Sequence, residues 1–410
     1  MRMLYLCHQY WPALCGSGIF FQEMAERLAK EGHSVSVFTT DALHFERFVR
    51  RDGARVVVRR ETRGGVSIRR FPLRHIPNYD RLRWRLKRLP FPAAPHLFGT
   101  GFLPGMAREG LRHHRVDAVH AGLVPYGMLL YLAWRIARRE GVPLIYSPFV
   151  HTGEPHDERV LRIHTDPAQM KLLAEADAVI AQTSIEAEAL RRAGVPADTI
   201  RIVGMGVDAV GLRGGDGERF RRAHGLRGTV LFSVGPKARD KGAEQTVRAF
   251  ERLLADGRDV SLVLAGPTYD SFRSFHASLP PAVGGRIAML ERVEGEEKRD
   301  LFAAGDIYVM PSRNESFGMV YLEAWACGVP VIGCAAGGVP AVVEDGADGF
   351  LVPFGDVDLL ADRIRLLLDA PERRREMGRR GRDKVASRYT WEIQYGKVKR
   401  LYASLGLLAG

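Results

Sequence analysis

Residues 307–333 hold the groups best suited to chemistry: an apolar strand, a polar loop, an apolar helix and a second strand. The helix is expected to begin near residues 316–318, where its first backbone N–H groups have no intrahelical partners. These donors and the positive end of the helix dipole favour a bound anion, such as a phosphate group. Glu323 is the single acid of this helix, and its side chain leans back toward the helix start. Because an unpaired buried carboxylate is costly, we expect Glu323 to accept hydrogen bonds from a ligand, such as a ribose diol beside a bound diphosphate.

The glutamates of this stretch also carry a family resemblance. Glu315, seven further residues, Glu323 and Ala324, followed by Gly-Val-Pro-Val at 328–331, resemble the signature of retaining glycosyltransferases of family four, which have the GT-B fold. The alternative is a capped helix in which Glu315 favours the dipole and Glu323 is solvated. The resemblance covers nearly the whole chain. It implies transfer of a sugar from a nucleotide-sugar donor to an acceptor hydroxyl, with the anomeric configuration retained.

The resemblance implies roles for the residues of this stretch. Glu315 would hold hydroxyls of the transferred sugar, and Glu323 would hold the ribose. Val293 lies in a loop that would contact the nucleotide base, mainly through its backbone, so its side chain does not identify the base. The donor's remaining contacts at the helix start would come from Ser316, Phe317, Gly318, Met319 and Val320.

Two lysines follow the first strand of the second half of the chain. Lys241 resembles the family's phosphate-binding lysine, and the alternative is a solvated loop lysine. The family usually has an arginine directly after the strand-ending glycine, whereas here Gly235 is followed by Pro236. Lys237 is therefore expected to compensate as a donor contact, and the alternative is a weaker second phosphate contact.

Two histidines end predicted strands of the first half. His151 stands just past the C-terminal end of a strand, where open α/β sheets bind ligands. In the family that it resembles, a histidine at this point reaches the transferred sugar; the alternative is a loop histidine bonded to backbone. His120 ends the preceding strand in a similar way and is a weaker second candidate.

A glycine turn follows the first predicted strand. Gly16, Ser17 and Gly18 open an amphipathic helix, and glycine lets the backbone approach a phosphate closely. Phe21 occupies the place of the third glycine of a dinucleotide fingerprint, so a nicotinamide site is disfavoured. In the family, a glycine pair at this turn faces the donor's diphosphate and sugar.

No metal or other cofactor is expected; the nucleotide sugar is a co-substrate. Lys241, the helix start at 316–319 and the glycine turn at 16–18 would stabilise the departing diphosphate electrostatically. Asp356 and Asp358 look like a metal-binding D-x-D motif, but we interpret Asp356 as a helix N-cap with Asp358 in the first turn. A metal site around His151 is disfavoured because its neighbouring ligands lie in a loop with a proline.

Strands and helices alternate through both halves of the chain, which predicts an α/β fold of two facing, doubly wound Rossmann-like domains. Residues 1–205 are expected to form an N-terminal acceptor-binding domain, and residues 206–390 a C-terminal domain that binds the nucleotide sugar. In GT-B proteins, a final helix like that at 391–410 crosses back to the first domain. The acceptor would be a small molecule or a lipid-linked hydroxyl compound, in glycolipid, polysaccharide or metabolite biosynthesis.

The composition is that of a soluble globular protein: 410 residues, 46% hydrophobic, 26% charged, and four cysteines without a paired motif. The net charge of +12 favours acidic partners. At residues 81–89, basic side chains alternate with Leu and Trp, a pattern typical of helices on anionic lipid; solvated arginines are the alternative. We therefore expect a cytoplasmic protein without a membrane span, with peripheral contact at the inner face of the membrane as an open hypothesis.

Two other functions compete with glycosyl transfer. A nucleotide-sugar epimerase or a glycogen-synthase-like enzyme would use the same fold and the same nucleotide site. A basic nucleic-acid-binding protein is disfavoured, because the chain has no RNA-binding motif and its basic run lacks a stacking-aromatic pattern. The donor sugar, the base and the acceptor stay open at this stage.

Overall fold

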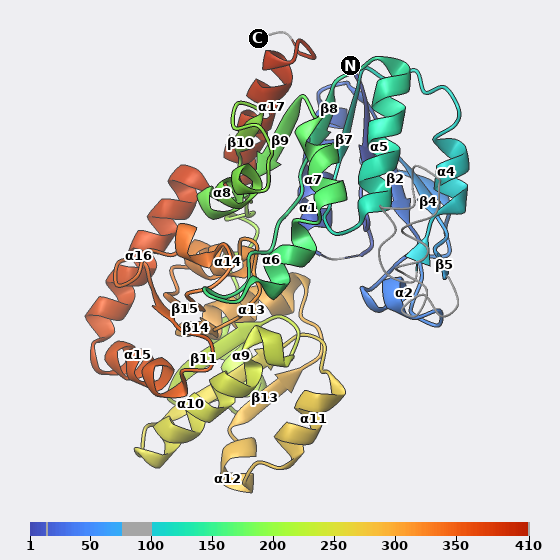
Figure 1. The fold of residues 1–410 in the computed structure, drawn as a ribbon. Coiled ribbons are helices and arrows are strands. Elements are labelled where there is room, and N and C mark those ends of the chain that lie inside the picture. Colours follow the sequence, from blue (N-terminus) through green and yellow to red (C-terminus); the bar gives the residue numbers. More distant parts are fainter. Residues whose placement is uncertain (14, 76–100, 409–410) are drawn as a thin grey trace. The chain divides into compact units, whose positions relative to one another are not determined.

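The computed structural model describes residues 1–13, 15–75 and 101–408 (Figure 1). The chain forms two compact units. Unit 1 takes its residues from Met1–Val150, Arg159–Gly204 and Gln394–Gly410, and unit 2 from His151–Glu158 and Met205–Ile393. The sequence prediction assigned the segment with His151 to the first domain, whereas this segment belongs to unit 2.

Unit 1 is built on an eight-stranded sheet with the order β10-β9-β8-β7-β1-β2-β4-β3. All neighbouring strands are parallel except β3 and β4. The strands are β1 Arg2–Leu6, β2 Ser34–Thr40, β3 Arg60–Arg63, β4 Val66–Phe71, β7 Ala118–Ala121, β8 Leu144–Tyr146, β9 Ala178–Ala181 and β10 Ile200–Ile202, with a separate pair of β5 Arg74–His75 and β6 Gly101–Phe102. Strands of such a sheet read as apolar runs because both faces are covered.

The helices of unit 1 are α1 Gly16–Lys30, α2 Glu46–Val49, α4 Pro104–Glu109, α5 Gly127–Glu140, α6 Glu158–His164, α7 Pro167–Ala174, α8 Ser184–Arg192 and most of α17 Trp391–Ser404. Several of these helices, among them α1, α5 and α8, pack against the sheet of unit 1 (Figure 1). Helix α1 shows the predicted amphipathic pattern, because Phe20, Phe21, Met24 and Leu28 are all buried.

Unit 2 is built on a six-stranded parallel sheet with the order β13-β12-β11-β14-β15-β16. Its strands are β11 Thr229–Val234, β12 Val260–Ala265, β13 Ile287–Leu290, β14 Ile307–Met310, β15 Val331–Cys334 and β16 Gly349–Val352. The strand order reverses between β11 and β14, so this is a doubly wound sheet whose ligand crevice is expected at the carboxyl ends of those two strands.

Helices pack on both faces of the unit 2 sheet. They are α9 Gly217–Ala223, α10 Ala243–Ala255, α11 Asp270–Ala277, α12 Pro281–Gly284, α13 Gly295–Ala304, α14 Met319–Ala326, α15 Val357–Asp369 and α16 Pro371–Arg388, with short 3₁₀ turns at Arg239–Lys241 and Val339–Ala341. On one face, Phe250 of α10 and Ile364 of α15 join Leu231 and Val309 of the sheet in one buried cluster. This core fixes the strand ends from which the candidate site is built.

The predicted elements at 307–333 are observed with small shifts. Strand β14 has the predicted bounds, and the helix begins at Met319 rather than at residues 316–318. Strand β8 ends at Tyr146 instead of continuing to residue 150, because Pro148 lacks the N–H that a ladder needs. The predicted basic helix at 81–89 lies outside the described residues, so contact with a membrane stays a prediction. Over the described ranges, no helix is long and apolar enough to cross a membrane.

Candidate active site

The start of helix α14 is shaped by a glycine that no other residue could replace without strain. Gly318 caps the helix with φ of +89°, and a Cβ at this position would lie 2.4 Å from the Tyr321 ring. The Tyr321 hydroxyl donates to the carbonyl oxygen of Met310 at 2.7 Å, which ties the helix to the end of β14. Within the described part of the chain, the N–H groups of residues 316–320 donate no backbone hydrogen bond. These groups therefore form a cluster of donors that suits an anion.

Lys241 and Glu315, both predicted from the sequence as functional residues, form an ion pair. Lys241 Nζ lies 2.5 Å from Glu315 Oε1 and 3.3 Å from the carbonyl oxygen of Asn314. Burial acts to lower the pKa of Lys241, but the adjacent Glu315 carboxylate outweighs burial and raises it. The ammonium is thus charged at neutral pH and lies between the end of β11 and the loop after β14.

The imidazole of His151 joins the same cluster from a distant part of the sequence. Its Nδ1 lies 2.8 Å from Asn314 Oδ1. Burial lowers the pKa of His151, and the neighbouring Lys241 lowers it further against the opposing effect of Glu315. The ring is therefore neutral at pH 7, and because Nδ1–H donates to Asn314, the Nε2 atom has acceptor character. A neutral histidine of this tautomer could accept a hydrogen bond from a sugar hydroxyl.

The loop that carries His151 contacts the rest of unit 2 through residues that the sequence analysis did not identify. The N–H of Gly337 donates to the carbonyl oxygen of Gly153 at 2.7 Å. Arg313 pairs with Glu154 and lies 3.7 Å from Asp157. Arg313 and Asn314 lie within the conspicuous 307–333 stretch, so their position could have singled them out, but their partners are more than 150 residues away.

Glu323 is mostly buried, with only 14% of its side chain exposed. Its Oε1 accepts from Lys298 Nζ of helix α13 at 2.7 Å. Its Oε2 is buried without a hydrogen-bond partner among the described residues. An unpartnered buried carboxylate oxygen is unfavourable, so this atom marks a place where ligand donors would be stabilising. The alternative of a solvated Glu323 is therefore wrong.

Lys237 is buried, and its ammonium contacts backbone carbonyl groups. The residue is only 2% exposed, and its ammonium donates to the carbonyl oxygens of Gly266, Leu290 and Leu264. Burial lowers the pKa of Lys237 to about 8. An ammonium has three N–H donors, and all of them are directed at backbone at the ends of β12 and β13. Because this geometry leaves no donor for a phosphate, it argues against Lys237 as a donor contact.

Two further predicted groups have known positions but no tested role. Val293 is buried in the loop between β13 and α13. Gly16, Ser17 and Gly18 form the first turn of α1 in unit 1, where the Cys15 side chain accepts from the Gly18 N–H. Their contact with the donor stays a prediction.

The weaker histidine candidate is a core residue. His120 is fully buried in unit 1, with Nδ1 2.7 Å from the Tyr402 hydroxyl and Nε2 2.8 Å from the Ser147 hydroxyl. Both ring nitrogens are satisfied, and burial lowers the pKa of His120 to about 3. The contact ties helix α17 to strand β7 and is structural.

The D-x-D sequence is a helix start, as predicted. Asp356 accepts from the N–H of Leu359 at 2.9 Å, and Asp358 pairs with Arg252. Across residues 1–13, 15–75 and 101–408, no group of three or more His, Cys, Asp or Glu side chains is placed to hold a metal ion. Whether the reaction needs a metal is not decided by this finding and stays a prediction.

The comparisons with known proteins bear on both halves of the chain. Residues 16–206 match the model of the glycosyl transferase 4-like domain, and residues 216–384 match that of glycosyl transferases group 1. A D-inositol 3-phosphate glycosyltransferase of Geodermatophilus obscurus is 30% identical over 95% of this chain and 84% of the relative. The chain belongs to the family-four glycosyltransferases. A second D-inositol 3-phosphate glycosyltransferase, from Saccharomonospora viridis, is 29% identical to this glycosyltransferase over 92% of the chain and 86% of the relative.

Solved structures confirm the predicted GT-B fold of this glycosyltransferase. Sucrose-phosphate synthase from Thermosynechococcus elongatus superposes with a TM-score of 0.74 at 22% identity, over 99% of each chain. Anabaena Alr3699/HepE in complex with UDP gives a TM-score of 0.74 at 19% identity, over 98% of this chain and all of the other. At these identities the likeness concerns the fold.

Proposed function

We propose that this glycosyltransferase moves a sugar from a nucleotide-sugar donor to an acceptor hydroxyl, with retention of the anomeric configuration and without a metal. The observation that carries the proposal concerns the partly buried Glu323, whose Oε2 has no partner among the described residues. Glu323 lies on helix α14, and the N–H donors of residues 316–320 lie at the start of the same helix. A nucleoside diphosphate would satisfy both features, with its ribose hydroxyls on Glu323 and its phosphates on the helix start.

The remaining residues of the cluster fit the chemical demands of this reaction. Loss of the nucleoside diphosphate leaves negative charge on the phosphates, which Lys241 and the helix start would stabilise without reorganisation. A phosphate oxygen would compete with Glu315 for the Lys241 ammonium, because both are anions within reach of the same donor. The Glu315 carboxylate would then accept from sugar hydroxyls, and neutral His151 would orient the sugar from the other side of Asn314.

The relatives suggest which substrates to test first. Solved structural neighbours contain UDP, UDP with glucose, and UDP-glucose, so UDP-glucose is the first donor to examine. Matching relatives are named D-inositol 3-phosphate glycosyltransferases, so inositol 3-phosphate is the first acceptor. Both substrate identities are proposals for this chain.

The experiment measures release of nucleoside diphosphate from UDP-, GDP- and ADP-glucose, with and without acceptor and with and without EDTA. We expect release that depends on acceptor and is unchanged by EDTA, and a product with an α-glycosidic linkage by NMR from an α-linked donor. Isomerisation of the donor without any acceptor would instead identify an epimerase. Activity that EDTA abolishes would overturn metal independence alone.

A further inference from the structure

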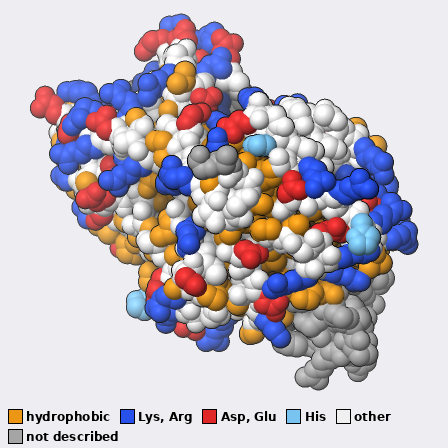
Figure 2. Space-filling view, turned by 90° about the horizontal axis from the view of Figure 1, so that it is seen from above, with side chains coloured by type: hydrophobic (Ala, Val, Ile, Leu, Met, Phe, Trp, Pro, Cys, Tyr) orange, Lys and Arg blue, Asp and Glu red, His pale blue; other side chains and the backbone are white. Residues whose placement is uncertain are grey.

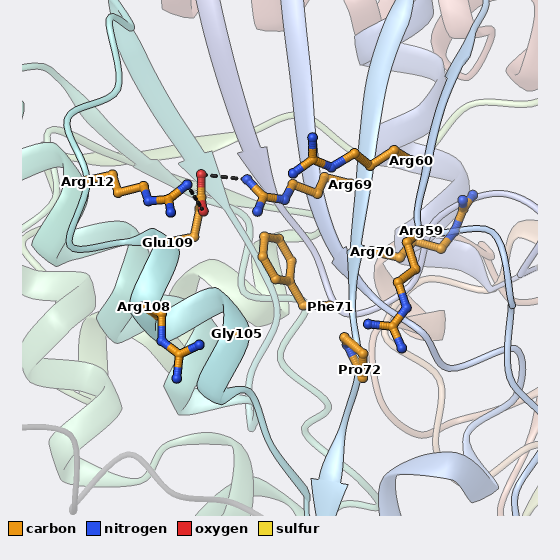
Figure 3. A pocket seen from close by; sticks show the side chains of 10 residues that line it. All are labelled: Arg59, Arg60, Arg69, Arg70, Phe71, Pro72, Gly105, Arg108, Glu109 and Arg112. Atoms are coloured by element: carbon orange, nitrogen blue, oxygen red, sulfur yellow. Dashed lines mark ion pairs between the residues drawn. The ribbon is translucent and has the colours of Figure 1, made fainter.

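Unit 1 contains a cavity of about 330 Å³ whose lining is dominated by arginine (Figure 3). Its walls are helix α4 on one side and the region of strands β3 and β4 on the other. The only acid among its lining residues is Glu109, and Phe71 and Pro72 add an apolar surface. The six basic lining residues are Arg59, Arg60, Arg69, Arg70, Arg108 and Arg112.

Many arginines outside this cavity are paired with acids. On the face drawn in Figure 2, basic side chains stand next to acidic ones in many places. Typical surface arginines have carboxylate partners, such as Arg379 with Glu376 and Arg365 with Asp256. A cluster of unneutralised arginines is electrostatically unfavourable, so its presence around a cavity suggests that an anion completes it.

The partners of the six arginines identify which of them are available. Arg70 is buried and is held by Glu61 and by the carbonyl oxygens of Trp11 and Val58, so it forms a fixed wall. Glu109 lies 2.5 Å from Arg69 and 3.3 Å from Arg112 and neutralises part of their charge.

The other three, Arg59, Arg60 and Arg108, form no ion pair or side-chain hydrogen bond with any described residue. All three are solvent-exposed, with Arg108 on the helix wall and Arg59 and Arg60 on the strand wall. In Figure 3 the guanidinium groups of Arg59 and Arg108 lie on opposite sides of Phe71 and Pro72, so the walls attract an anion through their summed positive charge. A phosphate monoester carries more negative charge at neutral pH than a carboxylate, so it gains more from this potential.

We propose that this arginine pocket is a binding site for a phosphate ester, whether the phosphate belongs to a soluble metabolite or to a lipid headgroup. The Arg69 guanidinium lies 4.9 Å from the centre of the Phe71 ring, and the organic part of the ester can pack against this pair. A cavity of this volume has room for a sugar-sized group with its phosphate. The site lies wholly in unit 1 and is independent of the nucleotide site proposed in unit 2.

The test is calorimetric titration of the full chain with glucose 6-phosphate, inorganic phosphate and glucose, and sedimentation with phosphatidylglycerol or phosphatidylcholine vesicles. We expect glucose 6-phosphate or phosphatidylglycerol vesicles to bind, and binding to weaken as salt is raised. Binding of the soluble ester identifies a metabolite site, and binding of anionic vesicles alone identifies a headgroup site. Absence of binding in both arms overturns the proposal.

Variants separate this site from the nucleotide site, which would also attract phosphate. The double change Arg59→Gln/Arg108→Gln should weaken binding by about tenfold or more, since each change removes one positive charge from a wall of the cavity. Arg55→Gln/Arg192→Gln, which removes the same charge from exposed positions outside the pocket, should leave binding unchanged. Lys241→Ala should impair UDP-glucose binding but not this titration. Equal loss in both double variants, or loss only with Lys241→Ala, would contradict the pocket.

A further variant changes binding in the opposite direction. Glu109→Gln removes the carboxylate that competes for Arg69 and Arg112, so it should tighten phosphate-ester binding several-fold. Weaker binding by a folded Glu109→Gln protein would show that the carboxylate itself contacts the ligand, and would count against a phosphate site.

Discussion

The two units use the same strand order around their central strands, but their chemistry differs at the point where the order reverses. In unit 1, His120 at the end of β7 is fully buried and bonded through both nitrogens to Tyr402 and Ser147. In unit 2, the loops after β11 and β14 bring together Lys241 and Glu315, which are only partly buried. The comparison shows that strand topology alone does not make a binding site. The side chains at the point of reversal decide whether it becomes part of the core or of an active site.

The two regions differ more clearly in whether their buried polar atoms have hydrogen-bond partners than in the types of residue they contain. The His120 ring has all its hydrogen-bonding atoms satisfied within unit 1. Glu323 in unit 2 keeps a buried oxygen without a partner among the described residues, and the donors of residues 316–320 lie nearby in sequence. An unpartnered buried carboxylate oxygen is unfavourable, so a ligand donor at Glu323 Oε2 would be stabilising.

The largest expected effect is on turnover. Its absence would contradict the assignment of the unit 2 cluster as an active site. Lys241→Ala removes the ammonium proposed to stabilise the departing diphosphate and should lower kcat by about 10²–10³-fold. Glu315→Ala should chiefly lower kcat as well, because it would hold the transferred sugar. The check is steady-state kinetics with UDP-glucose and an accepted hydroxyl compound. Wild-type kcat in a folded Lys241→Ala protein would remove Lys241 from the active site.

The second effect is on nucleotide affinity and sharpens the assignment of Glu323. Glu323→Ala removes the acceptor for the ribose and should weaken UDP binding by about tenfold or more, the loss expected for a hydrogen bond to a charged group. Isothermal titration measures the affinity. Lys298→Met is the control, since it removes the partner of Oε1 but keeps the carboxylate. If Lys298→Met weakens UDP binding while Glu323→Ala does not, the roles are reversed.

The third effect is on stability alone and tests the unit 1 side of the comparison. His120→Phe leaves the Ser147 hydroxyl without its buried partner, at a cost of about 1–3 kcal/mol, whereas the Tyr402 hydroxyl keeps its contact with Tyr5. The melting temperature should fall, whereas kcat and KM at a permissive temperature should not change. His113→Phe, at an exposed position, should alter neither. A selective loss of kcat in folded His120→Phe protein would make His120 a functional residue.

The smallest effect concerns Lys237 and its dependence on pH. Burial lowers the pKa of Lys237 from 10.5 to about 8, so the unfolded state binds more protons between these two pH values. The contribution of this group to stability is therefore least favourable below pH 8 and rises as the pH increases to 10.5. The melting temperature of the wild type relative to Lys237→Met should increase across this window. The exposed Lys171→Met variant should show no such trend, and a flat difference for Lys237→Met would place its pKa elsewhere.

Sequence patterns predicted the elements better than the contacts between them. The apolar run at β14 and the cap at Asp356 were predictable because their signals are local: strand composition in one case and an N-cap acid in the other. The partners of the site residues were not predictable. The Lys298 contact to Glu323, the Asn314 contact to His151 and the carbonyl cage of Lys237 all join separate elements. Lys237 in particular is a loop lysine of the kind expected at the surface, and only the tertiary structure shows that it is buried.

The most direct test of the central claim is the crystal structure of the protein soaked with UDP. The account predicts the diphosphate at the N–H groups of residues 316–320, within reach of Lys241, and a ribose hydroxyl within hydrogen-bond distance of Glu323 Oε2. UDP bound elsewhere, with the Glu323 carboxylate still contacting only Lys298, would contradict the assignment of this helix as the nucleotide site.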